Sequence, residues 1–240
     1  MNSKIRLYFP DKIQSDLVAH LKKEQSHYLK DVMRLKEGDT FSVFNNQGEW
    51  NASIVSYEKQ VAKIKITAKF RDKKNEQNIW LAFTPIKQNP LNFIIQKGTE
   101  LGVQKFIPIL SERTAVKNIN IERIKKIIIE SAEQSNRISV PEIIKLETLK
   151  NFISNFPQSG CLVFCDINCD KSNLRNILMQ KDLGPTCILI GPEGDFSENE
   201  RKLIIDLNQT HSISLAKNIL RAETAAVAAL TLVNYHLNLS

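Results

Sequence analysis

The residues best suited to chemistry lie in two short segments in the last quarter of the chain. The first directly follows the apolar run 187–190 and reads Gly191-Pro192-Glu193-Gly194. The second follows a short strand expected at 212–215 and contains Arg221 and Glu223. Glycines in such a loop let backbone N–H and C=O groups approach a ligand closely. Because open α/β sheets bind ligands at the carboxyl ends of their strands, the pattern predicts a small-molecule site.

Each segment also has an ordinary structural interpretation. Gly and Pro punctuate loops in many proteins, and Arg221 could pair with Glu223 only to brace a helix start. The alanine-rich run 225–229 makes a slim helix face against which another backbone must pack. The chain contains neither a G-x-G-x-x-G fingerprint after a strand nor a G-x-x-x-x-G-K-[ST] loop. Dinucleotide and triphosphate binding therefore lose their main support, and with them a nicotinamide-dependent oxidoreductase.

The elements that position these segments alternate between strand and helix. Apolar runs at 79–83, 105–110 and 161–166 predict strands, and each is followed by a helical pattern. Ser197 and Glu200 have the spacing of a capping box, and the last helix is expected from about 221 to 237. Repeated strand-then-helix order predicts an α/β domain whose parallel sheet is covered by helices on both faces.

The N-terminal part of the chain has a different character. Strands are expected at 40–44 and 63–67, separated from each other by turn signals, and a helical piece at 26–34 ends before Gly38. Residues 71–78 carry almost no apolar side chain and are typical of a linker. We therefore expect two domains, a β-rich domain over 1–72 and an α/β domain over 73–240.

The charge balance favours an anionic partner. Lys and Arg number 33 against 26 Asp and Glu, a formal net charge of +7, which suits RNA, DNA or a phosphorylated ligand. A basic surface can also serve solubility alone. No apolar run reaches the length of a membrane helix, and no signal-peptide core follows the first residues. We therefore expect a soluble cytoplasmic protein without a membrane partner.

The four cysteines raise the question of a metal site. Cys161, Cys165 and Cys169 are evenly spaced, which invites a metal-binding interpretation. However, 161–165 has the pattern of a buried strand, and no second Cys/His group completes four ligands. We expect neither a metal nor, in a cytosolic protein, a disulfide.

The two C-terminal segments together resemble the cofactor-binding signature of SPOUT-class RNA methyltransferases. More narrowly, nearly the whole chain resembles the RsmE family, which methylates N3 of a specific uridine in 16S ribosomal RNA. The matching motifs elsewhere in the chain are His27 with 32–34 and 38–39, Lys97 with 100–103, 112–114, and 130–137. Two departures stand out: Asp195 replaces a further glycine, and 216–218 replaces Leu-Gly-x.

The resemblance implies a fold, a cofactor and partners. The α/β domain would be a SPOUT domain with a deep trefoil knot, preceded by a PUA-like β-barrel that docks RNA. The cofactor would be S-adenosylmethionine, and the partners 16S rRNA or the small ribosomal subunit and a second copy of the chain in a homodimer. The residues expected to hold the cofactor are Gly191, Pro192, Glu193, Gly194, Leu215, Ile219, Leu220, Thr224 and Ala225.

The same resemblance suggests roles for charged residues. Arg221 is the first candidate to stabilise negative charge on the uracil carbonyl oxygens, and Glu223 would orient it or help bind the cofactor. The candidates for RNA contacts are Arg6, Arg34, Lys97, Arg113 and Arg137. Two alternatives remain open: a SPOUT methyltransferase with another RNA target, and a non-catalytic rRNA-binding assembly protein.

Overall fold

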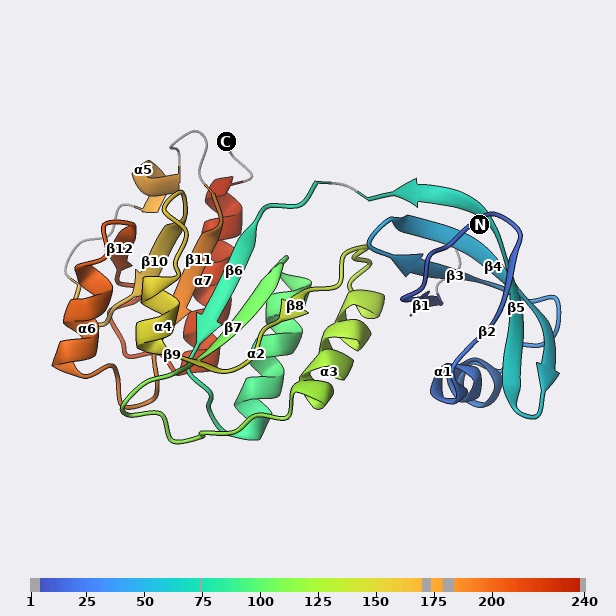
Figure 1. Cartoon of the computed structure of the whole chain (residues 1–240), viewed down its shortest axis with the longest axis horizontal. Helices are drawn as coiled ribbons and strands as arrows, with labels where there is room; N and C mark the ends of the chain where they lie inside the picture. Colours follow the sequence, from blue (N-terminus) through green and yellow to red (C-terminus); the bar gives the residue numbers. More distant parts are fainter. Residues whose placement is uncertain (1–4, 74, 170–173, 179–183, 238–240) are drawn as a thin grey trace. The chain divides into compact units, whose positions relative to one another are not determined.

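A computed structural model describes residues 5–73, 75–169, 174–178 and 184–237 (Figure 1). They divide between two compact units. The N-terminal unit combines the stretch up to residue 75 with 132–140, and the C-terminal unit contains 76–131 and the chain from 141 onward. The second stretch of the N-terminal unit lies outside the domain expected over 1–72.

The N-terminal unit is built on a five-stranded sheet in the order β1-β3-β4-β5-β2. β1 runs parallel to β3, and the other neighbours are antiparallel. The predicted strands at 40–44 and 63–67 are confirmed by β3 and β5. The core of the unit includes the fully buried Leu29, Phe41 and Ile64. The strands are β1 (Arg6–Tyr8), β2 (Leu17–His20), β3 (Thr40–Asn45), β4 (Gly48–Glu58) and β5 (Val61–Asp72).

The helical piece expected at 26–34 begins earlier and changes its winding. It starts as α1 (Lys23–His27) and continues as the π-helix η1 (Tyr28–Val32). Leu29 anchors it in the core of the N-terminal unit. The turn expected at Gly38 is confirmed, since this residue has φ of +87°, a conformation that favours glycine.

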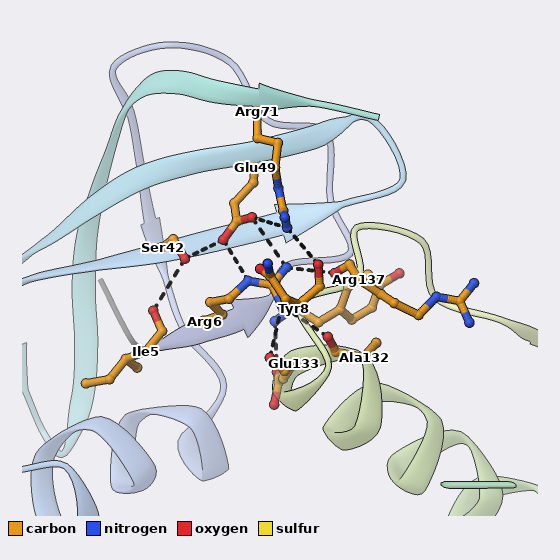
Figure 2. Close-up of polar contacts among 10 residues, drawn as sticks. Ile5, Arg6, Tyr8, Ser42, Glu49, Arg71, Ala132, Glu133 and Arg137 are labelled. Carbon is orange, nitrogen blue, oxygen red and sulfur yellow. Dashed lines mark hydrogen bonds and ion pairs between the residues drawn. The ribbon is translucent and has the colours of Figure 1, made fainter. Parts of the chain in front are cut away.

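A buried arginine joins the segment 132–140 to the sheet (Figure 2). The Nε of Arg6 donates to Oε1 of Glu49 at 2.8 Å, and one Nη2 donor reaches Oε2 of Glu49 at 3.4 Å. The three remaining donors bond to backbone carbonyl oxygens, those of Ala132 (3.1 Å), Glu133 (2.9 Å) and Arg137 (2.7 Å). A guanidinium carries five N–H donors, so every donor of Arg6 is engaged within the protein.

Glu49 is the acceptor at the centre of this cluster. Its carboxylate also accepts a hydrogen bond from Ser42 Oγ at 2.7 Å and forms an ion pair with Arg71 at 2.5 Å. Burial alone would raise the pKa of Glu49, but the hydrogen bonds from Arg6 and Ser42 and the two guanidinium charges outweigh it, and the pKa is lowered. The cluster therefore depends on an ionised carboxylate.

The C-terminal unit contains the expected parallel sheet, in the order β12-β10-β11-β6-β7-β8, with β9 also paired to β7. All these neighbours run parallel. The strand expected at 212–215 is β12, which ends at Ile213, two residues earlier than expected, and this leaves Leu215 in a loop. The strands are β6 (Ile79–Phe83), β7 (Lys105–Leu110), β8 (Glu142–Ile143), β9 (Glu147–Thr148), β10 (Cys161–Cys165), β11 (Thr186–Ile190) and β12 (Thr210–Ile213).

Helices cover both faces of this sheet, as the sequence predicts (Figure 1). Alternate strand residues such as Phe164 and Leu189 pack with α4 and α6. On the other face, α7 contacts α2, α5 and β11. The last helix expected from about 221 is confirmed as α7. The helices are α2 (Gln88–Glu100), α3 (Ile121–Gln134), α4 (Leu149–Ser154), α5 (Leu174–Leu178), α6 (Glu198–Ile205) and α7 (Ala222–Leu237).

Removing the buried guanidinium should destabilise the N-terminal unit strongly. We expect Arg6→Ala to lower the free energy of unfolding by about 3–5 kcal/mol, because it leaves buried carbonyls and a carboxylate oxygen without their donor. Arg34→Ala, which removes an exposed guanidinium of the same unit, should change it by less than about 0.5 kcal/mol. Urea unfolding followed by Trp50 fluorescence in a Trp80→Phe background measures both, and equal losses would contradict this role of Arg6.

The lowered pKa of Glu49 also predicts a pH dependence. Since its folded pKa lies below the unfolded value of about 4.3, its contribution is fully present above that value. The contribution is lost as the pH falls from there through the folded pKa. We expect the stability of the N-terminal unit to fall over this window in the wild type and to fall less steeply in Glu49→Gln. Urea midpoints at pH 6, 5, 4 and 3 test this, and parallel curves for the two proteins would refute it.

Candidate active site

A pocket lies at the carboxyl edge of the parallel sheet, beside the ends of β10 and β12. The pocket is open to solvent and has a cavity volume of about 80 Å³. One side is the turn after β10, and the other is the long loop between β12 and α7. The lining residues are Cys165, Asp166, Ile167, 213–220 and Ala225.

The structure divides the residues expected to bind a cofactor into two groups. Leu215, Ile219, Leu220 and Ala225 line the pocket. Among the residues that the structure describes, neither the segment 191–194 nor Thr224 lines the pocket. The segment follows β11, which is the neighbour of β10, so it lies at the same sheet edge, one strand beyond the turn that forms the pocket wall.

The segment 191–195, called the first loop below, is closely packed at its base. A Cβ on Gly191 would lie 3.0 Å from the ring of Phe196, so only glycine fits there without a shift of that ring. Phe196 is buried and meets Phe164 edge-on, with ring centroids 5.7 Å apart. The N–H of Asp195 donates to the carbonyl of Pro192 at 3.0 Å and closes the turn.

Two contacts fix the first loop and the start of α6 to the segment after β7. The Nη1 of Arg113 donates to the carbonyl of Gly194 at 2.8 Å. The buried Glu200 accepts the N–H of Glu112 at 2.8 Å and that of Ser197 at 3.1 Å, one on each carboxylate oxygen. The capping box expected at Ser197 is thereby confirmed. Its glutamate has a second role in joining two loops, which the local sequence pattern does not reveal.

Sequence reasoning missed the acid in the pocket wall. Asp166 is buried directly after β10, and its Oδ2 accepts hydrogen bonds from Arg201 of α6 at 2.7 and 3.1 Å. The hydrogen bond from Arg201 to Asp166 and the charges of Asp166 and Asp195 raise the pKa of Arg201, although burial opposes this. The rule that selected the other loops, attention to residues just past a strand end, would also have selected Asp166.

Arg221 and Glu223 lie at the start of α7, beyond the loop that lines the pocket. Arg221 is exposed and Glu223 is half-buried. Within the part of the chain that the structure describes, no ion pair joins these two side chains, so the interpretation of Arg221 as a brace paired with Glu223 finds no support. An exposed guanidinium beside a small-molecule pocket is available to a second ligand.

Comparisons with known proteins agree with this geometry. A family model described as an RNA methyltransferase domain matches residues 73–234, and one described as an RNA methyltransferase PUA domain matches residues 21–67. Ribosomal RNA small subunit methyltransferase E of Rickettsia conorii is 31% identical to this chain over 95% of it and 94% of its own length. The corresponding protein of Synechocystis sp. is 34% identical over 88% of this chain and 70% of its own length.

This chain belongs to the ribosomal RNA small subunit methyltransferase E family. A solved member of that family from Neisseria gonorrhoeae, bound to S-adenosyl methionine, matches with a TM-score of 0.85 and 26% identity over 96% of this chain and 97% of its own. A putative methyltransferase from Legionella pneumophila, in complex with the bound cofactor SAM, matches with a TM-score of 0.87 and 26% identity over 98% of both chains. The expected family, the α/β methyltransferase domain and the PUA-type N-terminal domain are confirmed.

The five basic residues expected to contact RNA fall into two groups in this member of the methyltransferase E family. Arg6 and Arg137 are buried in the N-terminal unit. Their burial differs from the expectation, because every donor of Arg6 is engaged internally and Arg137 Nη2 donates to Ser139 at 2.7 Å. Arg34 and Arg113 are exposed. Lys97 is partly exposed and bonds to Glu100 at 2.8 Å.

Cys161 and Cys187 are core residues, whereas Cys165 and Cys169 are half-buried. Burial raises the pKa of Cys161 to about 11 and that of Cys165 to about 12, and it also raises the pKa of Cys187. None of the four cysteines, all of which lie in the described ranges, forms a disulfide, and the described residues contain no His, Cys, Asp and Glu group that could hold a metal ion. Among the helices of the described ranges, none combines the length and apolar character needed to cross a membrane.

Glu200 should matter beyond its helix. We expect Glu200→Ala to lower the free energy of unfolding of the C-terminal unit by roughly 1–3 kcal/mol, because the N–H groups of Glu112 and Ser197 lose their acceptor. Glu198→Ala removes the same charge from the same helix turn, where the residue is exposed, and should cost less than about 1 kcal/mol.

Urea unfolding and hydrogen–deuterium exchange over 111–114 measure the two variants. Only Glu200→Ala should speed exchange at these amides. If exchange stays unchanged, Glu200 acts on α6 alone.

Proposed function

We propose that this protein transfers the methyl group of S-adenosylmethionine to N3 of a specific uridine in 16S ribosomal RNA. The observation that carries the proposal is the family membership over nearly the full chain, combined with the pocket between the β10 turn and the β12–α7 loop. The names of the relatives place their activity on small-subunit ribosomal RNA, and two matching structures contain the methyl donor.

The pocket fits the proposed cofactor chemically. Leu215, Ile219, Leu220 and Ala225 supply apolar surface for an adenosine, and the loop 213–220 supplies backbone polar groups. The pocket wall also carries charged groups, since Asp166 is paired with Arg201 and Lys217 lines the same pocket. We assign to the same site Gly191, Pro192, Glu193, Gly194 and Thr224. When bound, S-adenosylmethionine supplies an electrophilic methyl group on a sulfonium.

The chemistry that the protein must assist is a displacement at the methyl carbon. Loss of the N3 proton to solvent spreads negative charge onto the flanking carbonyl oxygens. This charge is neutralised as a bond forms from uracil N3 to the methyl carbon and the carbon–sulfur bond breaks, which leaves a neutral thioether. Arg221, exposed at the start of α7, would place its guanidinium against those oxygens, and Glu223, two residues on, would orient it or contact the cofactor.

The RNA side of the proposal uses the basic residues that remain accessible. We assign RNA contacts to Arg34 in the N-terminal unit and to Lys97 and Arg113 in the C-terminal unit. Arg6 and Arg137 are left out of this set because both are buried. Docking of the PUA-type unit on 16S rRNA or the small ribosomal subunit, with the target uridine turned out of its stack, would bring the base to the pocket.

The proposal also includes a homodimer and a cytoplasmic location for this protein. Large apolar side chains remain exposed on and before α7, with 61% of Tyr235 and 84% of Ile219 accessible. Such a surface suits a homodimer packed through the C-terminal units. A SPOUT trefoil knot in that unit and a division of function between 1–72 and 73–240 belong to the same proposal, as does a cytoplasmic location, where the proposed RNA substrate is found.

Arg221 should be needed for methyl transfer but not for cofactor binding. We expect Arg221→Ala to lower turnover by about 10²–10³-fold, because the charge on the uracil oxygens loses its partner. Its dissociation constant for S-adenosylmethionine should stay within about threefold of the wild-type value. Lys126→Ala, which removes an exposed cation of α3, serves as the control with unchanged turnover.

Purified protein, labelled methyl donor and unmodified small ribosomal subunits provide the assay, and mass spectrometry of digested rRNA identifies the product. Full turnover by Arg221→Ala would remove Arg221 from the mechanism. A wild-type protein that binds subunits but transfers no methyl group would favour the assembly-protein alternative, and a methyl group on another nucleotide would favour a different RNA target.

A further inference from the structure

Asp195 holds an uncommon backbone conformation at the end of the first loop. Its φ is +58°, in the left-handed region that glycine adopts at little cost and that other residues adopt at a cost. Asp is among the residues that tolerate this region, because its short side chain can hydrogen-bond locally. The carboxylate of Asp195 accepts two hydrogen bonds, from the N–H of Phe196 at 2.8 Å and from Nδ2 of Asn168 at 3.3 Å.

Asn168 connects Asp195 to the wall of the pocket. It lies in the turn after β10, where its own N–H donates to Oδ1 of Asp166 at 2.9 Å. Asp166 lines the pocket, and its N–H donates to the carbonyl of Ile213 at 2.9 Å, at the point where the β12–α7 loop begins. The side chain of Asn168 therefore joins the first loop to the turn after β10. This turn also contacts the start of the β12–α7 loop through Asp166.

Arg201 makes the approach of two acids favourable. It bonds to Asp166 through two nitrogens, and Asp195 is close enough for its charge to act on the same guanidinium. Without that cation, the two carboxylates would repel each other across the turn. With it, the repulsion between Asp166 and Asp195 is reduced, because both carboxylates interact with the same guanidinium.

We propose that the Asp195–Asn168 contact is a latch that positions the first loop against the pocket wall and so preorganises the site for its cofactor. The inference rests on the proposed function, since it assigns S-adenosylmethionine to this pocket. Asp195 and Asn168 are positioning residues here, because they act through the loop and the turn that they join. A site held in its binding geometry before the ligand arrives loses less conformational entropy on binding.

The latch makes stability and cofactor affinity change in opposite directions. Asp195→Gly relieves the positive φ, so its melting temperature should equal or exceed that of the wild type. The same variant loses the contact to Asn168, so its dissociation constant for S-adenosylmethionine should rise about three- to tenfold. A residue with a merely local structural role would not separate the two measurements.

The second variant leaves the backbone of the first loop unaltered. Asn168→Ala should weaken cofactor binding by the same factor. The double variant Asp195→Gly/Asn168→Ala should be no worse than either single variant, since each single variant already removes the Asp195–Asn168 contact.

Asp195→Asn keeps an oxygen acceptor and a residue type that tolerates this φ, and its dissociation constant should stay within about threefold of the wild-type value. The matched control is Asn199→Ala, which changes an exposed asparagine of α6 and should bind as the wild type does.

Isothermal titration calorimetry with S-adenosylmethionine and thermal unfolding provide the two readouts on the full chain. Wild-type affinity in Asp195→Gly, an Asn168→Ala variant equal to Asn199→Ala, or additive losses in the double variant would each overturn the latch while the proposed function stands. A wild-type protein that does not bind S-adenosylmethionine would overturn the proposed function, and the latch with it.

Discussion

Parallel alignment of the strands is the constraint on which the candidate site depends. Every neighbouring pair in the sheet of the C-terminal unit runs in the same direction, so the carboxyl ends of β10, β11 and β12 meet at one edge. Helices bury both faces of the sheet, which leaves the edge as the place where backbone and polar groups can face a ligand. The loops that the sequence singles out are brought near each other by this alignment, although they lie some twenty residues apart.

In the N-terminal unit, the positive charge of Arg6 is engaged within the protein. Arg6 lies over the ring of Phe44 at 4.4 Å while its donors bind Glu49 and three carbonyls. Such a guanidinium is already desolvated and satisfied, so a phosphate would have to displace several good hydrogen bonds to gain it. The net charge of +7 therefore does not show which cations an anionic partner meets, because both Arg6 and its partner Glu49 are interior.

Features that depend on neighbouring residues can be predicted from the sequence, whereas side-chain contacts between distant segments cannot. The capping box at Ser197 and the turn at Gly38 depend on residues within a few positions, and both are present. The burial of Arg6 depends on carbonyl groups more than 120 residues away, and no pattern near Arg6 announces them. The hydrogen bond between Glu200 of α6 and the N–H of Glu112 likewise joins residues 88 positions apart, and no local pattern indicates it. Asp195 is visible in the sequence as a departure from the family pattern, but its φ and its contact with Asn168 depend on the three-dimensional arrangement of the two loops.

The composition of the N-terminal unit from two separated stretches has a consequence for biosynthesis. The residues that complete it, 132–140, leave the ribosome well after residue 75. At roughly 5–20 residues per second, the wait lasts about 3 to 13 seconds. During that interval the Glu49 carboxylate and the guanidinium of Arg6 have each other but lack the three carbonyl acceptors that finish the cluster. The N-terminal unit therefore cannot complete its fold when its first 75 residues have emerged, and a nascent chain interrupted before residue 132 would carry an incomplete N-terminal fold, open to chaperones and proteases.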